Sequence, residues 1–213
     1  MSLLLNVPAE EETEAKSKGA LWDANLQTWY LPDINYDHIM EVDKWITDKD
    51  TAIILSDEVI IAHGLHSCLH CQQITPVIAL GSDFFYEKDI NEKDEAVWFE
   101  LNFFTLFQQV SVISPHLFNF FRDNYPHYKQ GPARSADGYY WCNHCEHCGQ
   151  GIDDTLLFAD TGHVFTPETS EAAAAITLRT FPFKYAPHID ADYHNNHHLR
   201  LINEFAVRSH YSI

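Results

Sequence analysis

The sequence predicts an α+β protein in two parts, a small β-α-β-β-α module over residues 1–48 and a larger β-rich domain over residues 49–213. Three observations predict it. Short apolar runs alternate with two helical patterns before residue 48, two C-x-x-C motifs start at Cys68 and Cys145, and the larger domain has one inserted and one C-terminal helical pattern. With 213 residues, of which 46 % are hydrophobic, the chain is long enough to bury a real core.

Acidic residues dominate the chain. Thirty-one Asp and Glu against 13 Lys and Arg give a formal net charge of −18, and the excess is spread along the whole sequence. A surface that binds nucleic acid concentrates Lys and Arg, because the release of counterions from phosphate dominates that affinity. The sequence contains no such concentration. The charge therefore favours either a basic partner or simply solubility.

Apolar runs and cysteine usage bear on location. The first eight residues include a short apolar run without a basic segment before it, so no secretory signal is predicted. No apolar stretch approaches the ~18 residues that a membrane span requires. Five cysteines, an odd number with four in metal-binding spacing, suit a reducing compartment better than a disulfide scaffold. We therefore expect a cytoplasmic protein with no membrane partner.

The first strand and helix of the module have clear boundaries. Residues 3–7 form an apolar run that predicts a strand, and Pro8 suits the first position of a helix because no N–H is needed there. The acidic residues 10–12 complement the positive end of the helix dipole. Gly19 predicts the end of the helix.

A hairpin and a second helix complete the module. Residues 20–22 and 28–31 predict two strands, because the Asp-Ala-Asn segment between them supplies turn residues. Asp33 or Asn35 can cap a helix over residues 36–47. The apolar positions at helical spacing in that helix are Ile39, Val42 and Ile46.

These residues carry a resemblance to a known family, a small bacterial domain of unknown function. The matching segments are Leu5-Asn6-Val7-Pro8, Ala15-Lys16, Gly19-Ala20, Trp22-Asp23 and Trp29-Tyr30-Leu31-Pro32. That domain occurs in plasmid-borne primases, conjugation proteins and uncharacterised bacterial proteins, and the likeness covers about residues 3–47. The module is more loosely similar to the repeated domain of annealing helicases. Both resemblances imply work near nucleic acid.

The charge of the module departs from that implication, since residues 1–47 contain nine acidic and three basic residues. Trp22, Trp29 and Tyr30 could stack nucleic-acid bases or contact a protein partner. The alternative is that these rings pack the two helices against the hairpin. Without a basic surface, packing is the preferred interpretation.

The two C-x-x-C motifs predict one metal site. This spacing lets two thiolates of a tight turn bind one ion, and two such turns complete a tetrahedral site of four sulfurs. Soft thiolates in that geometry select zinc or iron–sulfur, and zinc is the natural ion. We therefore predict that one structural zinc binds Cys68, Cys71, Cys145 and Cys148, with free thiols or a disulfide as the alternative.

The sequence around the motifs predicts a zinc-ribbon-like domain, because an apolar run at residues 75–80 follows the first motif and zinc ribbons are built as strand, turn and strand. The runs Thr-Pro-Val-x-Ala-Leu and Tyr-Tyr-Trp-x-Asn-His-Cys-x-His-Cys-Gly also resemble uncharacterised proteins that carry the N-terminal domain. That resemblance implies the same four ligands. Cys142 is left as a spare thiol. His70, His144 and His147 could replace a ligand or hydrogen-bond to one, but the preferred interpretation is that they are only neighbours of the site.

Further strands and helices are expected between and after the motifs. Before the first motif, residues 51–55 and 59–62 predict a hairpin. Between the motifs we expect an insertion over residues 83–138, with an acidic loop at 83–95, strands at 97–103 and 106–113, a helix at 115–124 and a loop at 131–138. After the second motif we expect strands at 155–158, 162–165 and 176–183, a helix at 168–176 and a helical tail within 190–209.

The sequence offers few features of an enzyme. A site of four cysteines is closed, so it contributes folding energy and not Lewis acidity. No phosphate-binding loop, nucleophile elbow or kinase signature occurs, and the His-Ala-Glu form of the zinc-deaminase motif is absent. Residues 188–198 contain four histidines and two aspartates that could bind a second metal, as in hydrolases. A polar, solvated segment before the last helix is the preferred interpretation.

We therefore expect an acidic, non-enzymatic module that binds a basic protein partner. A special case is an immunity or antitoxin-like protein that masks a basic toxin by charge complementarity. The first alternative is a nucleic-acid-associated accessory protein of replication, conjugation or repair. The weaker alternative is a metal-dependent hydrolase.

Overall fold

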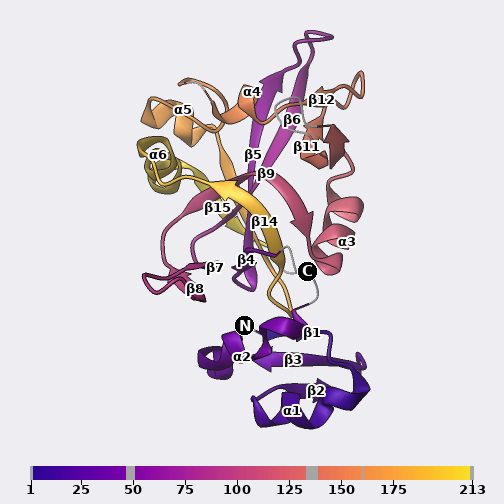
Figure 1. Cartoon of the computed structure of the whole chain (residues 1–213). Coiled ribbons are helices and arrows are strands. Elements are labelled where there is room, and N and C mark those ends of the chain that lie inside the picture. The colour runs from indigo at the N-terminus through magenta and orange to yellow at the C-terminus, as the bar shows by residue number, and fades with distance from the viewer. Residues whose placement is uncertain (1, 47–50, 133–138, 160, 212–213) are drawn as a thin grey trace.

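The computed structural model describes residues 2–46, 51–132, 139–159 and 161–211 (Figure 1). Its helices and strands are mixed along the chain, which agrees with the predicted α+β class. They form two three-stranded sheets and one nine-stranded sheet. No helix in the described part of the chain is long and apolar enough to cross a membrane.

The N-terminal module is built on a three-stranded antiparallel sheet of order β1-β3-β2. Its elements are β1 (Ser2–Leu5), η1 (Ala9–Glu11), α1 (Glu12–Ser17), β2 (Leu21–Asp23), β3 (Thr28–Pro32), η2 (Asp33–His38), α2 (Ile39–Val42) and η3 (Asp43–Trp45). Pro8 precedes the first helical turn, and Gly19 has a φ of +85° where that helix ends. The predicted strand, helix and hairpin are therefore present.

The second helix of the module differs from the prediction. A single helix was expected over residues 36–47, but the chain forms short helical pieces that are mostly 3₁₀, and residue 47 lies outside the described residues. The side chain of Asp33 accepts a hydrogen bond from the N–H of Ile34 at 2.8 Å. Asp and Asn side chains compete in this way with regular helical hydrogen bonds, and four of them lie within residues 33–43.

The module packs directly against the larger domain. Its core includes the fully buried Leu3, Leu31 and Val42, and the same cluster contains Ile54 and Ala186 of the larger domain. The N–H of Ala186 donates to the carbonyl of Ser2 at 2.7 Å. These contacts make part of each core depend on the other.

Asp23 adds a polar link between the two parts. Its carboxylate accepts hydrogen bonds from Lys184 Nζ at 2.7 Å and from Tyr185 Oη at 2.6 Å. The bond from Lys184, followed by that from Tyr185, holds the pKa of Asp23 well below its usual range. The carboxylate of Asp23 therefore stays charged at neutral pH and keeps its hydrogen bonds to Lys184 and Tyr185.

A nine-stranded sheet forms the centre of the larger domain, in the order β15-β13-β5-β6-β9-β14-β4-β7-β8. Among the strands of this sheet that the structure describes, β13 and β15 are parallel neighbours and the other pairs are antiparallel. The strands are β4 (Ile53–Leu55), β5 (Glu58–Ser67), β6 (Ile74–Ser82), β7 (Phe85–Ile90), β8 (Ala96–Leu101), β9 (Thr105–Ile113), β13 (Thr177–Pro182), β14 (His188–Tyr193) and β15 (Val207–His210).

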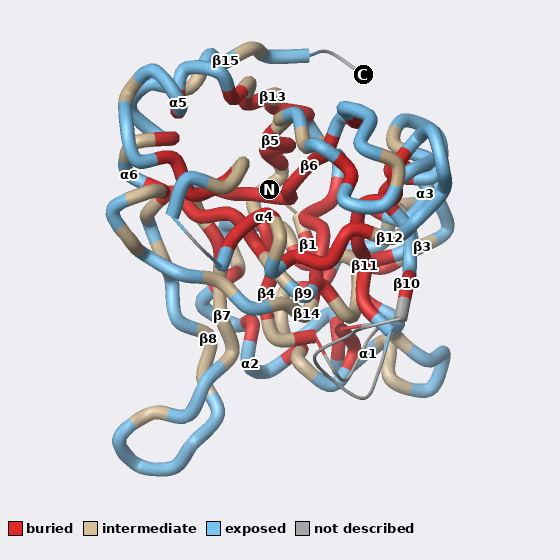
Figure 2. Tube along the Cα trace, turned by 90° about the horizontal axis from the view of Figure 1, so that it is seen from above, coloured by how far each residue is buried: buried red, intermediate tan, exposed pale blue. Residues whose placement is uncertain are grey.

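Helices cover both faces of this sheet (Figure 1). One face packs against α3 (Pro115–Asn124) and β11 (Tyr139–His144), through Phe120, Phe121 and Trp141. The other face packs against α4 (Thr155–Phe158), α5 (Ser170–Ala174) and α6 (His197–Phe205). The strands supply alternate residues to the two cores, for example Ile61 to the first and Ile60 to the second. Figure 2 shows this buried interior and the exposed chain around it.

Three sequence predictions for strands in the larger domain are wrong. Residues 51–55 and 59–62 do not form a hairpin, because β4 pairs with β14 and β7 while β5 pairs with β6 and β13. Residues 155–158 form the helix α4, and residues 162–165 form turns. Apolar runs of four residues fit a buried helical turn as well as a strand, so their periodicity could not separate the two.

The segment between the C-x-x-C motifs supplies part of the main sheet. The acidic loop expected at residues 83–95 contains β7, whose first residue, Phe85, is fully buried. Strands β8 and β9 and the helix α3 lie where they were predicted, and β9 is paired with both β6 and β14. The strand β10 (Tyr128–Pro132) follows, and most of the loop predicted at 131–138 lies outside the described residues.

The C-terminal region also differs from its prediction in one respect. The helix expected at 168–176 and the strand expected at 176–183 are present as α5 and β13. Residues 188–193 are not a solvated segment, because they form β14 inside the sheet with His188 and Ile189 buried. The predicted helical tail is α6, which begins at His197 after the side chain of Asn196 caps it by accepting from Leu199 N–H.

Candidate metal centre

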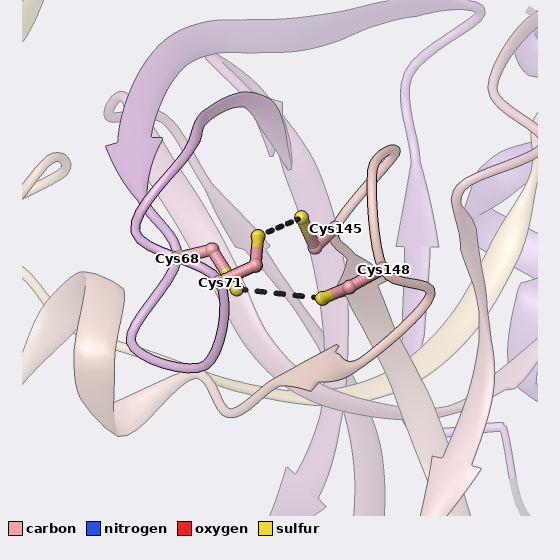
Figure 3. A group of neighbouring side chains, drawn as sticks. All are labelled: Cys68, Cys71, Cys145 and Cys148. Atoms are coloured by element: carbon pink, nitrogen blue, oxygen red, sulfur yellow. Dashed lines mark hydrogen bonds between the residues drawn. The ribbon is translucent and has the colours of Figure 1, made fainter.

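The four cysteines of the two motifs meet at one point (Figure 3). Cys68 and Cys71 lie in the turn between β5 and β6, and Cys145 and Cys148 lie in the turn between β11 and β12 (Gly151–Ile152). The nine-stranded sheet carries the first turn, and the small sheet β10-β11-β12 carries the second. The site therefore joins two sheets that share no strand.

The distances between the sulfurs fit a tetrahedral metal site. Sγ of Cys68 lies 3.8 Å from Sγ of Cys148, and Sγ of Cys71 lies 3.6 Å from Sγ of Cys145. All four sulfurs lie within 4.8 Å of one another. A tetrahedral ion that binds sulfur at about 2.3 Å holds its ligands about 3.8 Å apart. A disulfide needs about 2.05 Å, so neither close pair is bonded.

The two turns have the same backbone hydrogen bonds. In the first turn, Cys68 N–H donates to Gln73 O at 2.9 Å and Gln72 N–H donates to Cys68 O at 2.8 Å. The second turn repeats this pattern, with Cys145 N–H donating to Gln150 O at 2.9 Å and Gly149 N–H donating to Cys145 O at 2.8 Å. This shared geometry points both cysteines of each turn to the same side.

Each turn needs one residue with positive φ directly after its second cysteine. Gly149 has a φ of +71°, and Gln72 has a φ of +61° at the equivalent position. Only glycine adopts this left-handed conformation without steric cost. Gln72 compensates in part, because its Nε2 donates to Leu69 O at 3.0 Å across the turn.

We expect Gly149→Ala to lower the free energy of unfolding by about 1–2 kcal/mol. The cost comes from the backbone, since an added Cβ would meet no atom within 4 Å. Chemical denaturation of the metal-loaded protein measures it. Gly151→Ala is the matched control, because Gly151 lies two residues away, has no left-handed φ and offers its Cβ an ordinary contact at 3.8 Å. Equal effects of the two substitutions would contradict this role of Gly149.

Hydrogen bonds across the site hold the two turns together. Glu146 N–H donates to Thr75 Oγ1 at 3.1 Å, and Nε2 of His147 lies 3.0 Å from Ile74 O. The buried side chain of Asn143 acts like a strand edge, accepting from Ile78 N–H at 2.8 Å and donating to Ile78 O at 2.8 Å. These bonds position β11 over β6 without a ladder between the two strands.

The pKa values of the four cysteines indicate how readily the group can bind a cation. Burial opposes ionisation of Cys145, but backbone N–H groups of the same turn and the neighbouring thiols outweigh it and lower the pKa of Cys145 to about 6. The N–H of Gln150 favours the thiolate of Cys148, but partial desolvation of its sulfur and the other three thiols raise the pKa of Cys148 to about 12. One thiolate therefore forms readily, and a bound cation would be needed to stabilise four.

The remaining candidates around the motifs lie outside the sulfur group. Cys142 is buried on β11, where burial, followed by the nearby Asp154 and Asp153, raises the pKa of its thiol to about 12. His144 is also buried, with Nδ1 3.1 Å from Cys142 O. His70 is exposed. The four predicted cysteines are thus the ones brought together.

No second group of three or more metal-ligating side chains is assembled in the described ranges. The histidines of residues 188–198 are separated by their elements. His188 is buried in β14, His194 offers its carbonyl to Thr105 Oγ1, and His198 Nδ1 lies 2.8 Å from Pro167 O.

The three aromatic residues singled out in the module lie in different environments. Trp29 is buried in the module core, and Trp22 is 48 % exposed with its ring centroid 5.4 Å from that of Trp29. Tyr30 is half-buried, with its ring 6.0 Å from that of Tyr185. Of these three residues, Trp22 is the one whose ring is largely exposed.

Asp154 is a buried acidic residue that the sequence did not single out. Its Oδ2 accepts from Gln109 N–H at 2.7 Å, at a point where β9 bulges and Gln109 has a φ of +49°. Burial raises the pKa of Asp154 to about 7. Nothing in the local pattern distinguishes this residue from the adjacent Asp153.

We expect Asp154→Asn to stabilise the protein at pH 8 by about 1–3 kcal/mol. The raised pKa means that the folded protein holds this proton more tightly than the unfolded chain. The loss of folding stability caused by ionising Asp154 therefore grows from about pH 4 to about pH 7. Asparagine removes the charge and keeps an oxygen for Gln109. The advantage should vanish near pH 4, while the exposed control Asp192→Asn should show no such change. Urea unfolding at both pH values tests this, and a variant that is less stable at pH 8 would contradict it.

Comparison with known proteins identifies only the N-terminal part. A family model described as a domain of unknown function, DUF5710, matches residues 3–46. This match confirms the resemblance of the module to a small domain of unknown function. No curated protein and no solved structure is significantly similar to the chain.

Proposed function

We propose that this chain is a zinc-stabilised, non-enzymatic binding protein whose acidic surface receives a basic protein partner. Zinc is the preferred ion because four thiolates in a tetrahedral arrangement suit it, and the strand–turn–strand setting of both motifs suits a zinc-ribbon-like domain. Four protein ligands leave no open position for a substrate or water. The ion would hold the two sheets together, and a reducing cytoplasm would keep its thiolates available.

The distribution of ion pairs carries the proposal for a basic partner. Thirteen basic residues face 31 acidic ones. The basic residues that lie within 4 Å of the chain's own carboxylates are Lys16, Lys18, Lys44, Lys88, Arg122, Lys184 and Arg208. These pairs occupy over half of the basic side chains, so the surface field is strongly negative and favours a cationic protein. An immunity or antitoxin-like protein would use such a surface to mask a basic toxin.

The test is isolation of the protein from its own host at low salt, followed by native mass spectrometry. We expect a co-purifying protein rich in Lys and Arg. Its purified form should bind with an affinity that falls steeply between 50 and 300 mM salt, because surface charges are screened within about 10 Å at 0.1 M. An acidic partner, or an affinity that is independent of salt, would contradict the proposal.

A nucleic-acid-associated accessory role is the second candidate, favoured by the exposed ring of Trp22 on β2. Fluorescence anisotropy with single- and double-stranded DNA separates the two functions. We expect no measurable binding at physiological salt. Salt-sensitive binding that Trp22→Ala abolishes would favour the second candidate over the first.

A further inference from the structure

The strand β8 ends the nine-stranded sheet and leaves one long edge open. It pairs with β7 over six consecutive residue pairs, from Phe85–Leu101 to Ile90–Ala96, without a bulge. Across the described ranges, no strand pairs with its other side. The opposite end of the sheet is the shorter β15, which has four residues. Figure 2 shows the β7–β8 hairpin extending from the body, with an exposed tip.

The hydrogen-bond pattern identifies the open backbone groups. Asn91 N–H donates to Glu95 O at 2.9 Å, which makes Asn91 and Glu95 a hydrogen-bonded pair of the hairpin. Such pairs alternate along an antiparallel ladder, so Val97, Phe99 and Leu101 bond to β7. The residues whose N–H and C=O groups point to the open side are therefore Ala96, Trp98 and Glu100. Lys88, opposite Trp98, agrees with this, because its N–H donates to Ala52 O on the other side of β7.

This edge lacks several of the features that protect natural edge strands against strand addition. Natural edge strands carry proline, lysine or a bulge, or are very short. The sequence of β8 is Ala-Val-Trp-Phe-Glu-Leu, and its register with β7 is regular. Phe99 is 41 % exposed on one face of the strand. An added strand would thus find both free backbone groups and apolar surface.

Charge selects the kind of strand that can bind. The hairpin carries the exposed or half-buried acids Glu87, Asp89, Glu92, Asp94, Glu95 and Glu100. Its two lysines are Lys88, which is paired with Asp43, and Lys93. Two copies of this edge would repel each other, whereas a cationic strand would be attracted. The acidic side chains thus protect the edge from self-association and leave it open to a basic segment.

We propose that the open edge of β8 binds an extended, basic segment of a protein partner, which adds to the sheet as a further strand. The inference rests on the proposed function and names its surface. Backbone hydrogen bonds to Ala96, Trp98 and Glu100 supply the affinity, and alternate side chains supply the specificity. Glu100 and Phe99 point to opposite faces, so the segment alternates basic residues on the Glu100 face with apolar residues on the Phe99 face.

The test uses the full, metal-loaded chain and an eight-residue peptide of alternating Lys and Val. Amide hydrogen exchange by NMR should slow at least fivefold at Ala96, Trp98 and Glu100, with little change at Val97 and Phe99. The same peptide with proline at its centre should bind at least tenfold more weakly. Equal protection along the whole hairpin, or none on β8, would overturn the proposal.

Two variants separate this surface from the general charge of the protein. Ala96→Pro removes one open N–H and keeps the ladder to β7, and Glu100→Lys reverses a charge on an exposed side chain. Each should lower the affinity for the peptide at least tenfold, whereas the exposed control Glu168→Lys should change that affinity by less than about twofold. If all three variants bind the peptide equally and the slowed amides lie outside β8, the edge is not the site, but the proposal of a basic partner is retained. If neither the peptide nor any basic protein binds, the proposed function itself fails.

Discussion

Cys148→Ser is expected to release the bound metal and to abolish cooperative unfolding of the larger domain. A structural zinc site contributes about 10–16 kcal/mol in small zinc-binding peptides, which equals or exceeds the whole stability of a typical domain. Here the site joins the nine-stranded sheet to β10-β11-β12, so its loss leaves the two sheets connected only by packing and by hydrogen bonds such as those between Asn143 and Ile78. Metal analysis and thermal unfolding monitored by near-UV circular dichroism measure both effects.

The position of Cys148 makes this variant informative. Its side chain is exposed, so the substitution removes a ligand without leaving a cavity. Cys68→Ser should have the same effect at a buried position, and Cys142→Ser should keep the metal because Cys142 lies outside the sulfur group. A Cys148→Ser protein with full metal content and an unchanged midpoint would contradict the assignment.

Phe85→Ala is expected to lower the free energy of unfolding by about 3–5 kcal/mol. Phe85 is fully buried, and its ring centroid lies 5.5, 5.4 and 5.1 Å from those of Phe103, Phe107 and Tyr193. Removing the ring leaves a cavity between strands β7, β9 and β14, and it also removes three edge-to-face contacts. Urea unfolding at neutral pH measures the change.

Phe205→Ala provides the matched control, because Phe205 is 41 % exposed at the end of α6. It should cost less than about 1 kcal/mol, since the ring is partly in water already and lies outside the fully buried core. A similar loss for both variants would mean that the aromatic cluster around Phe85 is not the centre of this core.

The sequence predicted the elements whose signals are local. Pro8 and Gly19 bounded the first helix, and the run at 75–80 marked β6. It failed where tertiary context decides. Residues 83–95 are rich in acids, yet β7 forms there because Phe85 enters the core while the charged side chains remain at the surface. Long-range pairing also determined the partners of β4. The sequence suggested a hairpin with the next strand along the chain, but β4 pairs with β14 and β7.

The candidate site was more predictable than the fold around it. The C-x-x-C spacing identifies its own ligands, because two thiolates of one turn must face the same side. The supporting residues carried no such signal. Asn143, which bonds to both backbone groups of Ile78, and Thr75, which accepts from Glu146, become meaningful only when β11 lies over β6. The buried Asp154 and the open edge of β8 also depend on sheet order that no short motif encodes.

The most direct test of the metal centre is native mass spectrometry of the freshly purified, reduced protein, combined with elemental analysis. We predict one zinc ion for each chain and the simultaneous loss of zinc and fold upon chelation. A reduced, metal-free protein that stays folded would contradict the central claim that four thiolates and one ion hold the two sheets together.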